Sequence, residues 1–190
     1  MSPLESRVLD AAKACCERWG YEKVTIDDIA SASRVSRATI YRMFPGGKDV
    51  LFEALRVREL EEFFALLLQR VEGSTDLEEL LVRAVVAATQ ELRADEHLAL
   101  ALASEPGTTL SQLTVDGLPR IIRFANAFLA PLAEPYLGRE QARAVIDVLA
   151  RLTISYFLAP SDTVDLGDEE SARVFLRPFL TPHLTQGAFS

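Results

Sequence analysis

Residues 25–44 read TIDDIASASRVSRATIYRMF and predict two short helices joined by a tight turn. Thr25 followed by Asp28 is a capping box ahead of an apolar run, which marks the start of the first helix. Ser36 is a favourable N-cap for the second helix, because its hydroxyl accepts a hydrogen bond from a backbone N–H of the first turn. The turn between the helices is expected at residues 32–34.

The apolar residues of this stretch recur at helical spacing on one side of each predicted helix. Ile26 and Ile29 mark the inner side of the first helix, and Ile40 and Phe44 mark that of the second. The remaining residues of the second helix are therefore expected to point outward; they are Arg37, Ala38, Thr39, Tyr41 and Arg42. This pattern is typical of a helix-turn-helix, whose second helix enters the major groove of DNA.

The adjoining segment, residues 35–52, reads VSRATIYRMFPGGKDVLF and resembles the signature of TetR-family transcriptional regulators. Tyr41, the aromatic Phe44 before the Pro/Gly turn, and Lys48 after that turn carry the resemblance. Arg34 departs from the pattern, because such turns usually carry glycine. If the position needs a positive φ, arginine incurs a steric cost there. Either the turn is remodelled or Arg34 has a role, such as contact with a phosphate.

The resemblance implies an all-α fold with two domains. Residues 1–47 would form a three-helix helix-turn-helix DNA-binding domain, and residues 48–190 a helical bundle for ligand binding and dimerisation. In such proteins the last two long helices pair with those of a second copy. Here residues 139–158 and 169–180 occupy the matching positions, and the first of these is apolar nearly all round, which requires cover on several sides.

The rest of the chain also shows helical periodicity. Long helices are expected at residues 48–71 and 76–93, and a further helix over residues 118–136. Pro131 and Pro135 fall late in that helix, so it either kinks there or simply ends near Ala130. Residues 105–119 look too irregular for one helix and could form a ligand gate or a plain surface loop.

The chain has 190 residues, 49% hydrophobic residues and a net charge of −8. No stretch approaches the roughly 18 apolar residues of a membrane span, and the amino end does not resemble a signal peptide. We therefore expect a cytoplasmic protein with no membrane partner. The adjacent Cys15 and Cys16 are expected to be buried, reduced thiols, since neighbours on a helix project in different directions.

The negative net charge is compatible with DNA binding because of how the charges are distributed. Residues 34–48 contain four basic residues and no acid, whereas acids outnumber arginines in the second half. Salt screens charges beyond roughly 8–10 Å, so the local patch matters more for phosphate binding than the total does.

These observations predict a ligand-responsive, sequence-specific transcriptional regulator. It would bind a palindromic operator in double-stranded DNA as a homodimer through its last two helices, and a small hydrophobic effector would release it as a repressor. The predicted DNA-binding residues are Thr25, Arg34, Ser36, Arg37, Thr39, Tyr41, Arg42 and Lys48. The predicted ligand-binding residues are Phe64, Leu102, Phe124, Phe128 and Tyr156.

No catalytic residues, metal ligands or cofactor are predicted. The two histidines, His97 and His183, are far apart in the sequence, and no metalloprotease, Walker or nucleophile-elbow motif occurs. Two alternatives remain open. One is a helical small-molecule carrier or enzyme without DNA binding, and the other is a DNA-binding dimer that takes no effector.

Overall fold

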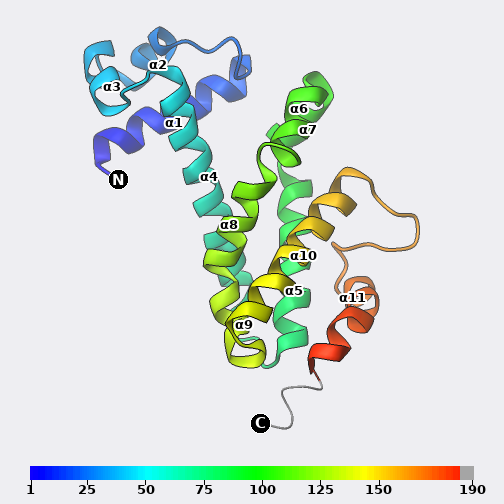
Figure 1. The fold of residues 1–190 in the computed structure, drawn as a ribbon. Helices are drawn as coiled ribbons and strands as arrows, with labels where there is room; N and C mark the ends of the chain where they lie inside the picture. Colours follow the sequence, from blue (N-terminus) through cyan, green and yellow to red (C-terminus); the bar gives the residue numbers. More distant parts are fainter. Residues whose placement is uncertain (185–190) are drawn as a thin grey trace. The chain divides into compact units, whose positions relative to one another are not determined.

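The computed structural model describes the backbone of residues 1–184 and the side chains of residues 1–180. This part of the chain contains eleven α-helices and no strand, which confirms the predicted all-α fold (Figure 1). The chain divides into two compact units, Met1–Glu61 and Glu62–Ser190. This division falls inside one long helix, whereas the predicted domain boundary after residue 47 stays a prediction.

Unit 1 contains three short helices and the first part of a fourth. They are α1 (Pro3–Trp19), α2 (Ile26–Ser33), α3 (Arg37–Met43) and α4 (Lys48–Val71), of which α4 continues into unit 2. Their apolar faces share one core, in which Leu9, Ile29, Ile40 and Leu51 are fully buried. The apolar positions singled out in the sequence thus lie on the inner faces of α2 and α3, as predicted.

A buried cation ties α1 to α4. The Arg58 side chain is 9% exposed, and its Nη1 lies 2.7 Å from Oδ1 of Asp10 and 3.4 Å from the Ser6 carbonyl oxygen. A charge-assisted hydrogen bond of this length offsets much of the cost of removing the guanidinium from water. The two helices are therefore held together by an ion pair as well as by apolar packing.

Unit 2 is built around α5 (Leu77–Ala94) and α10 (Arg139–Leu158), which pack against each other (Figure 1). The other helices are α6 (Glu96–Ser104), α7 (Pro106–Leu113), α8 (Leu118–Phe128), α9 (Ala130–Leu137) and α11 (Glu169–Leu184). Helices α8 and α9 pack on α10, and α11 packs on α5. Among the described residues no helix is both long and apolar enough to cross a membrane.

Two predictions for unit 2 differ from the structure. Residues 106–113 form α7 where an irregular segment was expected, because Pro106 at the first turn sets a helical φ and needs no N–H partner there. The expected helix over residues 118–136 is two helices, α8 and α9, separated at Leu129, so the first ends close to Ala130, as the alternative had it. Pro131 has no N–H to continue the helical ladder, so the chain restarts rather than kinks.

Candidate DNA-binding surface

The two helices of the predicted helix-turn-helix begin at their predicted caps. Thr25 Oγ1 accepts from the Asp28 N–H at 3.2 Å, and the Asp28 carboxylate accepts from the Thr25 N–H at 2.9 Å and from its hydroxyl at 2.6 Å. The hydrogen bonds from the Thr25 side chain and backbone lower the pKa of Asp28. Ser36 Oγ accepts from the Thr39 N–H at 3.2 Å and caps α3.

The turn between the helices passes through Arg34 in the left-handed conformation, with φ 55° and ψ 34°. The Val35 N–H then donates to the Ala30 carbonyl at 3.3 Å, a bond typical of helices that end on such a residue. The turn is therefore not remodelled to suit arginine. Arg34 therefore adopts a sterically costly conformation at a position where such turns usually carry glycine.

Helix α3 presents a polar and basic outer face. Ile40 is fully buried, Phe44 just after the helix is 2% exposed, and Met43 packs against the same core, so the opposite side of the helix turns outward. Arg37 and Arg42 are exposed, and Tyr41 is 46% exposed. Seven residues of helix with one buried face and one cationic face have the character of an element that enters a DNA groove.

Tyr41 is positioned by the glycine turn that follows α3. Gly47 has φ +70°, and a Cβ at that position would lie 3.0 Å from Tyr41 Cε1. The tyrosine ring therefore lies close to the backbone of the turn, where a larger residue would displace it. Because only glycine adopts this φ without strain, the backbone and the ring depend on the same residue.

Lys48 is bound within the protein. Its Nζ donates to the Glu22 carbonyl oxygen at 3.0 Å and lies 5.3 Å from the centroid of the Phe52 ring. The lysine thus links the amino end of α4 to the loop before α2. Its predicted contact with a phosphate stays a prediction, and such a contact would have to share or replace the carbonyl bond.

The remaining predicted DNA-binding residues lie close together on α2, the turn and α3. Thr25, Arg34 and Ser36 are exposed, whereas Thr39 is half-buried and its hydroxyl lies 2.9 Å from Ser36 Oγ. Asp27 was missed in the sequence, although its carboxylate forms an ion pair with Arg37 at 2.9 Å. Its position in the first turn of α2 pointed only to helix stabilisation, and the pair spans ten residues.

Charge is unevenly divided between the two units. Unit 1 has ten basic and ten acidic residues, and unit 2 has ten basic and eighteen acidic residues. The whole net charge of −8 therefore belongs to unit 2, and unit 1 is neutral with its acid-free stretch at residues 34–48. Phosphate binding is thus favoured locally on unit 1 despite the acidic chain.

A second candidate site lies in unit 2, among the residues predicted to bind a ligand. The rings of Phe64, Phe124 and Phe128 stack with centroids 5.8–6.3 Å apart. Tyr156 instead contacts Phe175 of α11, with ring centroids 5.3 Å apart, and Leu102 lies on α6. The structure brings three of the five together, and their role in ligand binding stays a prediction.

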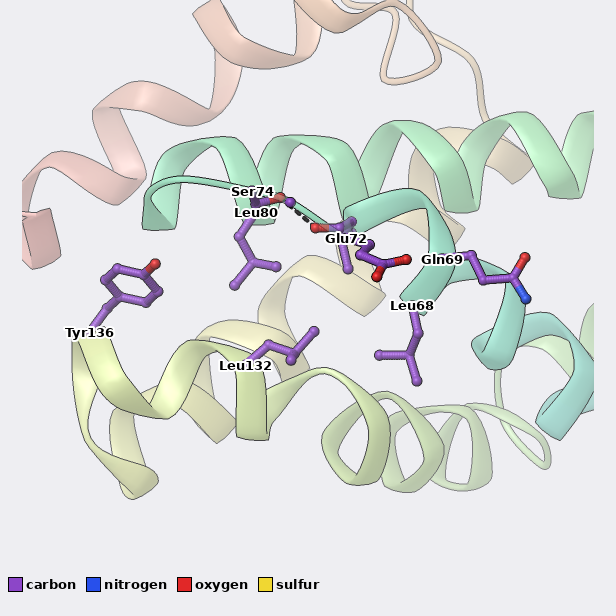
Figure 2. Close-up of a pocket in the computed structure, with 9 residues that line it drawn as sticks. Leu68, Gln69, Glu72, Ser74, Leu80, Leu132 and Tyr136 are labelled. Carbon is purple, nitrogen blue, oxygen red and sulfur yellow. Dashed lines mark hydrogen bonds between the residues drawn. The ribbon is translucent and has the colours of Figure 1, made fainter.

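A groove of about 460 Å³ lies elsewhere in unit 2, between the end of α4, the start of α5 and α9. Figure 2 shows Leu80 of α5 and Leu132 of α9 extending toward the same space, with Tyr136 at one end. The lining residues are Leu68, Gln69, Val71, Glu72, Gly73, Ser74, Leu80, Leu132 and Tyr136. The volume is within the roughly 300–1,000 Å³ of small-molecule sites.

A capped helix pair with a cationic outer helix is a helix-turn-helix, and here an all-helical second unit follows it. Residues 8–55 match the family described as bacterial regulatory proteins, tetR family. This amino-terminal part of the chain is thus similar to the TetR family. This confirms the resemblance seen in the sequence.

Several relatives and solved structures are similar to this chain. An uncharacterized HTH-type transcriptional regulator of Mycobacterium tuberculosis is 31% identical over 120 residues, which are 59% of this chain and 61% of that protein. The TetR family repressor AlkX from Dietzia sp., implicated in biodegradation of n-alkanes, has TM-score 0.69 at 22% identity and 98% and 97% coverage of this chain and its own. The fatty acid degradation regulator FadR from Bacillus halodurans has TM-score 0.53 at 20% identity, with 97% and 96% coverage.

Proposed function

We propose that this protein is a transcriptional regulator that binds DNA in a sequence-specific manner through α3. The observation that carries the proposal is the outer face of α3, where Arg37, Tyr41 and Arg42 are exposed while Ile40 is buried on the opposite side. Base edges would be contacted by Arg37, Thr39 and Arg42. Phosphates would be contacted by Thr25, Arg34, Ser36, Tyr41 and Lys48.

We infer that the active form is a homodimer through α10 and α11. Exposed apolar side chains support this: Val148 on α10 is 53% exposed, and Val174 and Phe179 on α11 are 62% and 57% exposed. Burial of such residues against a second copy would be favourable, since each apolar side chain removed from water contributes about 1.5–3 kcal/mol when fully buried. Two α3 helices would then read a palindrome with half-sites about 34–36 Å apart.

We further propose that a small apolar effector binds unit 2 and releases the protein from DNA. The groove is the favoured location, because it offers about 460 Å³ of open space. The three phenylalanine rings instead stack on one another and fill the space between them. Leu68, Leu80 and Leu132 supply an apolar lining. Release requires that the effector bind the DNA-incompetent conformation more tightly than the competent one.

The DNA-binding proposal is tested with operator DNA obtained by selection from a random duplex library and from the region upstream of the coding sequence. Arg37→Ala should weaken binding to the selected duplex by about 1–3 kcal/mol, concentrated at particular base pairs. Arg123→Ala removes the same charge from an exposed site on α8 in unit 2 and should leave binding unchanged. An equal loss on all sequences would assign Arg37 to a phosphate contact.

The effector proposal is tested on the same complex by titration with medium-chain fatty acids and n-alkanes, the classes of compound named for two structural relatives. Leu132→Trp should fill the groove and abolish any release, and Leu132 is 39% exposed, so the fold should accept the larger side chain. Phe128→Ala is the matched control, because it alters the stacked rings and leaves the residues that line the groove unchanged. A protein that binds no duplex would favour the carrier, and a complex that no compound releases would favour a dimer without effector.

A further inference from the structure

The ion pair between Asp27 and Arg37 lies on the proposed DNA-binding surface. Arg37 Nε lies 2.9 Å from Asp27 Oδ1, and Nη1 donates to Oδ2 at 3.4 Å. Both side chains are largely exposed, Arg37 by 61% and Asp27 by 64%. An exposed pair of this kind adds little to folding stability, so its position on this surface needs another explanation.

Asp27 affects two kinds of DNA contact by Arg37 differently, one with a base edge and the other with a phosphate. A guanidinium has five N–H donors, so Arg37 can keep its pair with Asp27 while its remaining donors reach the O6 and N7 acceptors of a guanine. The guanine edge is uncharged, whereas a phosphate carries a negative charge that the Asp27 carboxylate repels. Two such charges about 4 Å apart in water change an equilibrium by roughly fivefold.

An unrestrained arginine on this surface would bind phosphates on any sequence. Phosphate contacts supply most non-specific affinity and carry no sequence information. Specificity is a difference between two affinities, and it rises when the wrong contact is penalised. The geometry therefore favours a neutral base edge over a phosphate as the target of Arg37.

We propose that Asp27 is a specificity-determining residue, which holds Arg37 away from DNA phosphates and so suppresses binding to the wrong sequences. The inference rests on the proposed function, in which Arg37 contacts base edges. Asp27 thereby lowers the affinity for non-specific DNA and changes the affinity for the operator little.

The experiment compares the dissociation constants of the full chain for its selected duplex and for a scrambled duplex, at about 150 mM ionic strength, where long-range effects are screened. The proteins are wild type, Asp27→Asn, Arg37→Ala and the double variant. Asp49→Asn is the matched control, because it removes the same charge from an exposed position in the first turn of α4. Fluorescence anisotropy of labelled duplexes gives both constants.

Asp27→Asn should tighten binding to the scrambled duplex. The specificity ratio, which is the dissociation constant for the scrambled duplex divided by that for the selected duplex, should therefore fall by about fivefold. Asp49→Asn should change that ratio by less than about twofold, and so should Asp27→Asn in the Arg37→Ala background. A ratio that does not respond to Asp27→Asn would overturn the inference, as would an equal fall in the control or in the Arg37→Ala background. A wild type without preference for any duplex would overturn the proposed function as well, which distinguishes the two failures.

Discussion

Replacing Arg34 by glycine should stabilise the protein while it weakens DNA binding. Arg34 has φ 55° and ψ 34°, the left-handed region in which a residue with a Cβ costs about 1–2 kcal/mol. Glycine removes that strain but loses more conformational freedom on folding, about 0.5–1 kcal/mol. The Arg34 side chain is exposed, so little packing is lost. The net expectation is a gain of about 0.5–1 kcal/mol.

The assay is urea unfolding of wild type, Arg34→Gly and Arg34→Ala, with the slope against denaturant checked for constancy. A gain of about 1 kcal/mol corresponds to roughly 2–4 °C in melting temperature for a protein of this size. Arg34→Ala is the matched control, because it removes the same guanidinium and keeps the Cβ. The glycine variant should therefore be more stable than the alanine variant, because alanine keeps the strain at this φ. Equal stability of the two variants would refute the strain argument.

The same two variants separate stability from function. If Arg34 contacts a phosphate, both should weaken binding on all sequences and reduce the salt dependence of log K by about one unit. A strained residue persists where the surrounding structure or a function maintains it. Stabilisation by glycine together with unchanged DNA binding would remove the functional reason for arginine at this position.

Three further predictions concern unit 1. Gly47→Ala should destabilise the fold by about 1–2 kcal/mol and weaken DNA binding, because its φ is +70° and its Cβ would crowd Tyr41; urea unfolding and anisotropy measure the two effects. Asp28 has a lowered pKa because of its bonds with Thr25, so it stabilises the fold above its unfolded pKa and that contribution disappears as the pH falls through the folded pKa; Asp28→Ala should therefore lower stability at neutral pH but not in strong acid. Burial raises the pKa of Cys16 to about 12, so its thiol should resist alkylation at pH near 8 until urea unfolds the chain, and fast labelling of the native protein would contradict this.

The helix-turn-helix could be predicted closely because its determinants are local. Thr25 and Ser36 cap helices within three residues of themselves, and the apolar spacing of Ile29 and Ile40 fixes which sides are buried. The concern about Arg34 was also local, since the conformation of one residue decided it. Local interactions of this kind can be predicted from a sequence, because the interacting residues lie three or four positions apart.

Contacts between distant residues could not be predicted in this way. The Asp27–Arg37 pair spans ten residues and depends on the angle between α2 and α3, and the Lys48 bond to the Glu22 carbonyl spans 26. Neither has a signature in composition or spacing. The same holds for the groove, because it depends on the separation of α8 from α9 at Leu129 and on the exposed side of α9 that results.

Helix α4 belongs to both units, so under the proposed function it connects the effector site in unit 2 to unit 1 along the chain. Its first half is fixed to unit 1 by the Lys48 bond to Glu22 and by the Arg58 pair with Asp10. Its second half contributes Phe64 to the stacked rings and Leu68 to the groove. Under the proposed function, an effector needs about 5.5 kcal/mol of preference to reverse a 99:1 population, so more than one contact in unit 2 would have to differ between the two conformations.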